Sequence, residues 1–202
     1  MWRSFSGYVC NLGCVPYCIR KRLRASYAFV VVDVLGLTYR TIHLPSDAAR
    51  VARNRRDACI ETFGDDSRFE GDVRYLAWLK DKIEEYPEGF VLAFKGKRFV
   101  GHLELQVPYG KTLGYVNLFY LARSFRGAGN GKLLHAYAER YFRSWEAQRV
   151  ELHVSPTNRR AVQFYQKLGY HAVRLEGTSA PLWRMELCLN APAGQNAGDK
   201  SM

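Results

Sequence analysis

A run of glycines between two regular segments is the part of this 202-residue chain best suited to bind an anion. Gly127, Gly129 and Gly131 follow a strand-like segment, 115–121, and open a strongly amphipathic helical segment. The first N–H groups of a helix have no partner within the helix, and the helix dipole favours negative charge beside them. The sequence therefore predicts a phosphate-binding loop at residues 126–131.

The spacing of the run excludes two common nucleotide-binding motifs. A dinucleotide fingerprint needs G-x-G-x-x-G, but Lys132 stands at the last glycine position, and the preceding strand opens no early βαβ unit. A P-loop needs glycine where Arg126 stands and Ser or Thr where Leu133 stands. A different class of phosphate ligand must therefore be considered.

A second motif lies further along the chain and carries Asn158, Ala161, Tyr165, Lys167, Gly169 and Tyr170. Residues 126–131 resemble the R/Q-x-x-G-x-G/A pyrophosphate loop of the GNAT acetyltransferase superfamily. Residues 158–170 resemble its N-x-x-A-x-x-x-Y-x-K-x-G-F/Y segment, at a family-like separation. The motif match covers residues 115–170, and the order of elements matches from about Tyr39 to Leu189. Two linked motifs are far more specific than one.

The resemblance implies how acetyl-CoA, the acyl donor of this family, would bind. Backbone groups of Phe119 and Leu121, with Tyr120 between them, would pair with the pantetheine arm in the manner of an added strand. The N–H of Leu121 would polarise the acetyl carbonyl, and the Asn158 side chain would bind the pantetheine. The pyrophosphate would be held by the backbone amides of Arg126, Gly127, Ala128, Gly129, Asn130 and Gly131. The implied reaction requires no metal.

The resemblance also points to catalytic residues. Tyr165 falls where the family keeps the tyrosine that meets the thioester sulfur, and its phenol can protonate a departing thiolate. His153 matches a position where some members place a catalytic glutamate, and histidine titrates near neutral pH. Alternation along its strand puts His153 on the face opposite Leu152 and Val154. Glu104, on a central hairpin strand, is a second candidate base, and a chain of ordered water is a third. Core packing of Tyr165 and a structural hydrogen bond of His153 remain open alternatives.

The elements that must position these residues follow from the hydrophobic pattern. Ser46 can cap one helix that ends at Gly64, and Asp72 can cap a second helix that ends at Pro87. Helical spacing recurs after the glycine run, and again after Thr157, which can cap a helix that ends at Gly169. The sequence therefore predicts four helices.

Alternating or apolar segments predict the strands between these helices. The hairpin 90–94 and 99–106 turns at Gly96, which can adopt a positive φ. The other expected strands are 39–43, 115–121, 150–154, 170–175 and 182–189. The resulting order, β α α β β β α β α β β, predicts an α/β GNAT fold with a mixed central sheet of six to seven strands and about four helices.

Composition divides the chain into three parts. Residues 1–36 form a basic and apolar arm that resembles nothing in the family, residues 37–189 form the expected acetyltransferase domain, and residues 190–202 form a polar tail expected to be disordered. The arm is open to three interpretations: an organellar targeting peptide, translation from an upstream start codon, or an extra strand packed on the domain. It contains no run of 18 apolar residues, so we expect no membrane span.

The net charge of +11 raises the alternative of nucleic-acid binding. Before residue 41 six basic residues face one acid, so this segment supplies 6 − 1 = +5 of the total. The remaining charge is interspersed with acids, and a cofactor with several phosphates would itself favour a positive field. We therefore do not expect nucleic acid to be the main partner.

The cysteines indicate a reducing compartment. Five cysteines in a chain of this size do not form a disulfide scaffold, so we expect a cytoplasmic protein, with organellar targeting by residues 1–36 left open. Cys10, Cys14 and Cys18 recur every fourth residue but lack a CxxC pair or a histidine partner, and we expect no metal site there.

The sequence as a whole predicts an N-acetyltransferase that moves an acetyl group from acetyl-CoA to a primary amine by direct attack. The acceptor is a small molecule or a protein or peptide, and the acids Asp65, Asp66 and Glu70 could attract a cationic amine. The alternative from another class is a non-catalytic module with the same fold that binds acyl-CoA for regulation. The sequence leaves open whether the protein forms a homodimer.

Overall fold

The computed structural model describes residues 30–32, 36–108 and 112–189. The strands of this part are β1 (Val30–Val32), β2 (Thr38–Thr41), β3 (Phe90–Lys95), β4 (Arg98–Gln106), β5 (Leu113–Leu121), β6 (Arg149–Val154), β7 (His171–Glu176) and β8 (Leu182–Cys188). The helices are α1 (Ala48–Phe63), α2 (Asp72–Glu85), α3 (Asn130–Ser144) and α4 (Arg159–Lys167), with a 3₁₀ turn at Arg123–Phe125. The predicted order of elements is therefore confirmed from β2 to β8.

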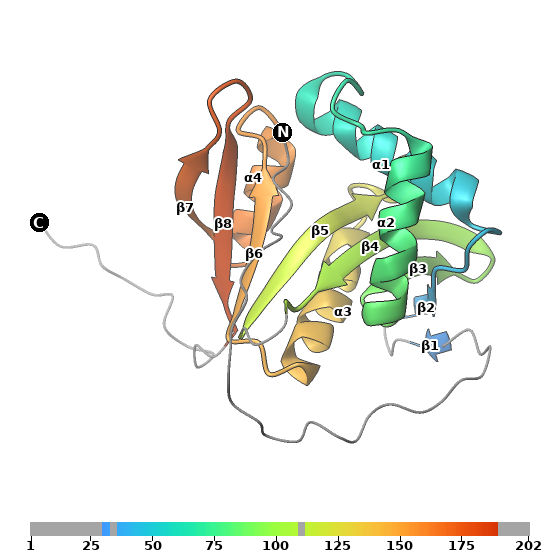
Figure 1. The fold of residues 1–202 in the computed structure, drawn as a ribbon. Coiled ribbons are helices and arrows are strands. Elements are labelled where there is room, and N and C mark those ends of the chain that lie inside the picture. The colour runs from blue at the N-terminus through green and yellow to red at the C-terminus, as the bar shows by residue number, and fades with distance from the viewer. Residues whose placement is uncertain (1–29, 33–35, 109–111, 190–202) are drawn as a thin grey trace, which may run out of the picture.

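The strands form one mixed sheet in the order β1-β2-β3-β4-β5-β6-β8-β7 (Figure 1). Every neighbouring pair is antiparallel except β5 and β6, which run parallel. A parallel pair needs a crossover connection, and α3 provides it. The predicted α/β fold with a mixed sheet is confirmed, with β1 as an additional short strand at one edge.

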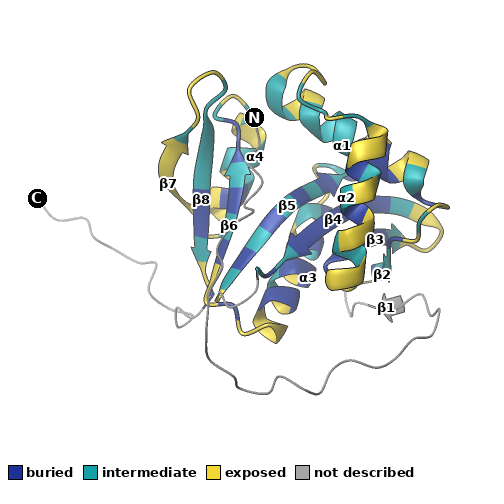
Figure 2. Cartoon of the chain, in the orientation of Figure 1, coloured by how far each residue is buried: buried dark blue, intermediate teal, exposed yellow. Residues whose placement is uncertain are grey.

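Helices cover both faces of the sheet. Figure 1 shows α1 and α2 over one face and α3 and α4 over the other. In β3 the alternate residues Phe90 and Leu92 pack in a core with Val51 and Leu79 of α1 and α2. Val91 and Ala93 pack in the larger core that includes the buried face of α3. Figure 2 shows the central strands buried, whereas the outer faces of the helices are exposed.

The start of α1 differs from the sequence prediction. The helix begins at Ala48, after Asp47 rather than after Ser46. The Asp47 carboxylate does not cap the helix, because it binds the Arg40 guanidinium at 2.6 and 2.7 Å and accepts the His43 N–H at 2.9 Å. Apolar periodicity marks a helix but does not reveal such a partner from a neighbouring strand.

Glycines at positive φ end and begin several elements. Gly64 ends α1 at φ 94°, and Gly96 turns the β3–β4 hairpin at φ 58°, as predicted. Asp72 is the first residue of α2 rather than its cap, because Gly71 occupies the preceding position at φ 89°. The Asp72 carboxylate instead pairs with Arg56 of α1 at 2.8 Å.

The arm that precedes the domain contributes one strand. Val30–Val32 pairs with Thr38–Arg40 of β2 in antiparallel register. This pairing agrees with an extra strand added to the sheet, which is one of the three interpretations of residues 1–36. Residues 1–29 and 190–202, with Cys10, Cys14 and Cys18, lie outside the described residues, and the proposed division into domains stays a prediction.

Two irregularities in the centre of the sheet shape the site. Along the β4–β5 pair, Glu104 faces Leu118 but Leu105 faces Val116, so Asn117 is an extra residue that forms a β-bulge. The β5–β6 pairing ends at Val116 and Leu152. Beyond this point the two strands separate (Figure 1), and Leu118–Leu121 are paired on their β4 side alone.

Close packing beside this separation gives a stability prediction. A Cβ at Gly114 of β5 would overlap the Phe142 ring of α3. We expect Gly114→Ala to lower the free energy of unfolding by about 1–3 kcal/mol, as overpacked cores do. Chemical denaturation measures the change. The cost should shrink in the background of Phe142→Leu, and an equal cost in both backgrounds would contradict the steric explanation.

Candidate active site

The unpaired edge of β5 presents backbone hydrogen-bonding groups toward the gap between β5 and β6. The N–H of Ala122 donates to Val100 of β4 at 2.9 Å. Because backbone groups alternate in direction along a strand, the N–H of Tyr120 also faces β4, whereas those of Phe119 and Leu121 face the gap. The Leu121 carbonyl agrees with this direction, since it accepts from Arg126 Nε at 2.9 Å rather than from β4.

The glycine loop joins this edge to α3. Gly127 and Gly129 have φ values of 85° and 77°, and a Cβ at either position would meet no atom within 4 Å. Their backbone conformation, rather than crowding within the chain, therefore favours glycine. Within the described residues, no N–H from Gly127 to Gly131 donates to another backbone group. These N–H groups and the N-terminus of α3 form a candidate anion site.

Side chains around the loop fix its shape. Asn130 is buried, and its Nδ2 donates to the Phe125 carbonyl at 2.9 Å. Arg126 reaches Glu61 of α1 at 2.9 Å in addition to the Leu121 carbonyl. These side chains are committed to the protein, so Arg126 and Asn130 can contribute to a ligand site through their backbone. Ala128 lies between the two left-handed glycines.

Gly131 serves packing. A Cβ at this position would lie 3.0 Å from the Phe164 ring of α4, which is closer than ordinary van der Waals contact. The absence of a side chain lets α3 approach α4 at the end of the gap. The glycines of the loop therefore have two physical roles, one conformational and one steric.

The start of α4 corrects another predicted cap. Asn158, not Thr157, is the N-cap, and its Oδ1 accepts the Ala161 N–H at 3.1 Å. Thr157 is engaged instead with the Ser155 hydroxyl at 2.7 Å. An asparagine that caps through its oxygen keeps its Nδ2 donors. Within the described residues these donors have no partner, so they remain available to a ligand carbonyl.

Tyr165 projects from α4 into an aromatic cluster beside the open edge. Its ring is 9% exposed and contacts Phe119, Phe164 and Tyr170, with ring centroids 5.3–6.2 Å away. Burial raises the pKa of the phenol well above its ordinary value. Its hydroxyl has no partner among the described residues and is not enclosed. The phenol therefore keeps its proton and can donate it.

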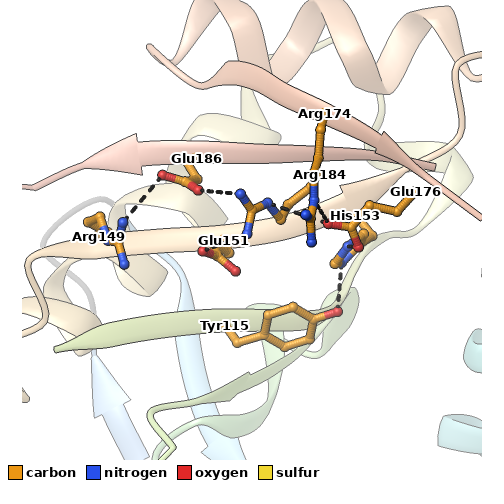
Figure 3. A network of polar contacts seen from close by, with 8 residues as sticks. All are labelled: Tyr115, Arg149, Glu151, His153, Arg174, Glu176, Arg184 and Glu186. Atoms are coloured by element: carbon orange, nitrogen blue, oxygen red, sulfur yellow. Dashed lines mark hydrogen bonds and ion pairs between the residues drawn. The ribbon is translucent and has the colours of Figure 1, made fainter. Parts of the chain in front are cut away.

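His153 lies on the opposite face of the sheet, in a polar network on β5, β6, β7 and β8 (Figure 3). Its Nδ1 is 3.0 Å from the Tyr115 hydroxyl, and its Nε2 is 3.0 Å from the Glu176 carboxylate. Glu176 also accepts from Arg174 at 2.6 Å and lies 3.6 Å from Arg184. The predicted face is observed, because Leu152 and Val154 point into the core beneath α3. The network continues through Glu151, Glu186 and Arg149.

Glu104 is enclosed within the protein. Its side chain has no exposed surface and is held by the Tyr75 hydroxyl at 2.5 Å and by Arg55 at 3.5 Å. Burial raises the pKa of its carboxyl, although Arg55 and Tyr75 oppose the shift. Arg55 also donates to the carbonyl of the bulged residue Asn117 at 2.8 Å. Glu104 therefore supports the bulge through Arg55 and offers no surface to an amine in this conformation.

Its neighbour His102 is a buried group that the sequence did not single out for chemistry. The imidazole has no exposed surface, and burial lowers its pKa to about 3. It lies 3.4 Å from the Glu104 carboxylate and makes no hydrogen bond. Within the described residues no group of His, Cys, Asp and Glu could hold a metal ion, and no helix is long and apolar enough to cross a membrane.

An unpaired strand edge that ends at a left-handed glycine loop and a helix N-terminus suits an extended ligand that carries a phosphate. Residues 51–170 match the sequence profile of the acetyltransferase (GNAT) family. This match spans more than half of the chain, which therefore belongs to the GNAT family of acyltransferases. The family, the fold and the class of enzyme predicted from the sequence are confirmed.

A curated relative agrees with this assignment over part of its length. The chain is 31% identical over 84 residues to a mycothiol acetyltransferase of Streptomyces scabiei. The alignment covers 42% of this chain and 27% of that protein.

Solved structures share the fold. Ard1 of Thermoplasma volcanium superposes with a TM-score of 0.61 at 22% identity, over 76% of this chain and 97% of that chain. Spermidine N-acetyltransferase of Vibrio cholerae, solved with CoA and spermine, gives 0.63 at 17% identity, over 77% and 96%. A Salmonella typhimurium acetyltransferase, yncA, solved with acetyl-CoA, gives 0.60 at 16% identity, over 80% and 99%.

Proposed function

We propose that this protein transfers the acetyl group of acetyl-CoA to a primary amine of a small molecule or of a protein or peptide. The observation that carries the proposal is the placement of a proton donor and a proton acceptor on the two faces of the gap. Tyr165 approaches it from the α4 side, and His153 lies on the α1 and α2 side. Direct attack on a thioester uses a proton acceptor for the amine and a proton donor for the departing thiolate.

The residues around the gap fit acetyl-CoA as the acyl donor. The exposed N–H groups of Phe119 and Leu121 can pair with an extended pantetheine arm, and the Asn158 amide can donate to one of its carbonyls. Tyr120 does not offer its own groups to the pantetheine arm, because its N–H faces β4 and its hydroxyl donates to Asp57 at 2.9 Å. It takes part indirectly, as the residue between Phe119 and Leu121. The loop amides from Gly127 to Gly131 suit a pyrophosphate.

The chemistry assigned to the chain has three parts. A backbone N–H on the open edge of β5, that of Leu121 in our proposal, steadies the oxyanion that forms when the amine attacks. His153 is the base on which the proton transfer from the amine ends. Tyr165 protonates the CoA thiolate as the carbon–sulfur bond breaks, and its raised pKa makes the phenol the dominant form at neutral pH.

The charges of the α1–α2 loop bear on the choice of the acceptor amine. The acids of the α1–α2 loop are engaged within the protein: Asp65 with Ser67 at 2.6 Å, Asp66 with Arg56 at 3.6 Å, and Glu70 with Arg74 at 3.0 Å. A polycationic acceptor would have to compete with these arginines. This arrangement favours an acceptor with a single reacting amine over a polyamine.

The test of the proposed function is release of CoA thiol from acetyl-CoA in the presence of a mixed panel of amines and peptide N-termini. Amine-dependent release, with mass spectrometry showing the acetylated product, is the expected result. Binding of acetyl-CoA by calorimetry without any transfer would contradict the enzyme and support the regulatory module.

The pH dependence of the reaction tests His153. Since an imidazole accepts a proton only when it is neutral, kcat/KM should rise with pH through the neutral range and then level off. His153→Ala should remove this limb. If water accepts the proton instead, the rise of kcat/KM with pH follows the pKa of the amine in both proteins. That pKa is near 10 for a lysine-like acceptor. Superimposable profiles of wild type and variant would exclude His153 as the base.

A further inference from the structure

The two ring nitrogens of His153 are both occupied. A carboxylate can only accept, so Nε2 must carry the proton that bonds to Glu176. Nδ1 of the neutral ring is then an acceptor, and the Tyr115 hydroxyl must donate to it. Partners on both sides therefore fix the tautomer. No nitrogen of the ring is left to meet an amine directly.

Tyr115 stands where the two strands separate. It precedes Val116, the last residue of β5 paired to β6, and His153 follows Leu152, the last residue of β6 paired to β5. Gly114 and Val116 face α3, so the Tyr115 side chain lies on the α1 and α2 face. Figure 3 shows its hydroxyl directed at the His153 ring. The pair thus bridges the base of the gap.

The electrostatic setting favours one protonation state of Tyr115 and one of Glu176 at neutral pH. Burial raises the pKa of Tyr115 to about 12 despite the opposing charge of Arg55, so the hydroxyl retains its proton. Burial alone would raise the pKa of Glu176, but hydrogen bonds from Arg174 and His153 outweigh it and hold the pKa below its ordinary value. Tyr115 is therefore a neutral phenol and Glu176 a carboxylate.

We propose that the Tyr115 hydroxyl is the group that takes the proton from the acceptor amine, while its own proton passes to His153 and Glu176 orients the ring. This inference rests on the proposed function. As the new carbon–nitrogen bond forms, the nitrogen-bound proton moves to the Tyr115 oxygen and the phenol proton moves to Nδ1. The imidazolium then faces the Glu176 carboxylate. Tyr165 supplies the separate proton that the CoA thiolate receives as the carbon–sulfur bond breaks.

The kinetic test is a double-variant cycle. Tyr115→Phe removes one hydroxyl and should lower kcat/KM by about tenfold or more with acetyl-CoA affinity unchanged. Residues that act as one unit are not additive, so Tyr115→Phe combined with His153→Ala should cost no more than the costlier single change. Tyr86→Phe is the matched control, since its hydroxyl donates to the Val107 carbonyl at 2.9 Å and is not part of the site.

Two kinetic outcomes would contradict the proposed proton transfer from the amine through Tyr115 to His153. One is a Tyr115→Phe enzyme that is as active as Tyr86→Phe. The other is a double variant whose loss equals the product of the two single losses, because that result makes the two residues independent.

A second measurement does not depend on turnover. An NMR titration of the His153 ring, assigned by its loss in His153→Ala, should shift to lower pH by about one unit in Glu176→Gln, because an ionised partner favours the imidazolium. The other charged groups near the ring are Arg174 on β7, Arg184 on β8 and Glu151 on β6. An unchanged titration would remove Glu176 from the unit. Failure of the wild type to acetylate any amine would instead contradict the proposed function. Failure of the proton-transfer proposal and failure of the proposed function are therefore distinguishable.

Discussion

Gly129→Glu should abolish measurable binding of acetyl-CoA. A side chain at this position extends into open space beside the loop amides, where it would set a carboxylate against the pyrophosphate. Juxtaposed like charges cost several kcal/mol, and each 1.4 kcal/mol is tenfold in affinity, so we expect a loss of about a hundredfold or more. Isothermal titration calorimetry with acetyl-CoA measures it.

The control for this prediction separates charge from backbone strain. Gly129 has φ 77°, and any L residue there costs about 1–2 kcal/mol of stability. Gly129→Gln has the same shape and strain without the charge, so it should retain much of the affinity while its thermal midpoint matches that of Gly129→Glu. Equal affinity of the two variants would show that the phosphate binds elsewhere.

Tyr165→Phe should lower kcat by about 10²–10⁴-fold, which is typical for loss of a general acid. The change removes one hydroxyl and almost no volume, so the aromatic contacts with Phe119 and Tyr170 should persist. Steady-state kinetics with one amine measure kcat, and calorimetry should find acetyl-CoA affinity little changed. The loss then belongs to the chemical step and not to binding.

Another buried tyrosine provides the comparison for Tyr165. Tyr137 of α3 donates to the Glu88 carbonyl at 2.7 Å, and its ring stacks on Tyr39 at 4.0 Å. Tyr137→Phe should leave kcat within a few-fold of wild type. Wild-type turnover in Tyr165→Phe would assign the phenol to packing alone and leave thiolate protonation to water.

Much of the fold could be predicted because its signals are local. Hydrophobic period, and glycines such as Gly64 and Gly96 at positive φ, marked the helices and the hairpin to within a few residues. The predicted helix caps were wrong at Ser46, Asp72 and Thr157, because the choice of cap depends on partners elsewhere in the chain. The intrinsic preference of a residue for the N-cap position does not reveal whether a group from a neighbouring strand or loop already binds its side chain.

The site was predictable where a motif defines it and not where tertiary contacts do. The glycine loop was singled out from its residue types and spacing, and Tyr165 from the resemblance of its motif to the GNAT family. Tyr115 and Glu176 were missed as partners of His153, because they lie 38 and 23 residues away in sequence. They meet His153 only when β5 and β8 pair with β6 and β7 pairs with β8. Alternation along β6 correctly placed His153 opposite the core, which was the one available signal.

The short parallel pairing of β5 with β6 also links ligand binding to the mechanical continuity of the sheet. Within the described residues, the ladder that joins the five strands on one side to the three on the other runs from Leu113 with Arg149 to Val116 with Leu152. A ligand that hydrogen-bonds along the open edge of β5 while contacting α4 would connect the part of the sheet that ends at β5 to the part that begins at β6. Its binding energy would oppose their separation, with a stabilisation that grows as the logarithm of ligand concentration.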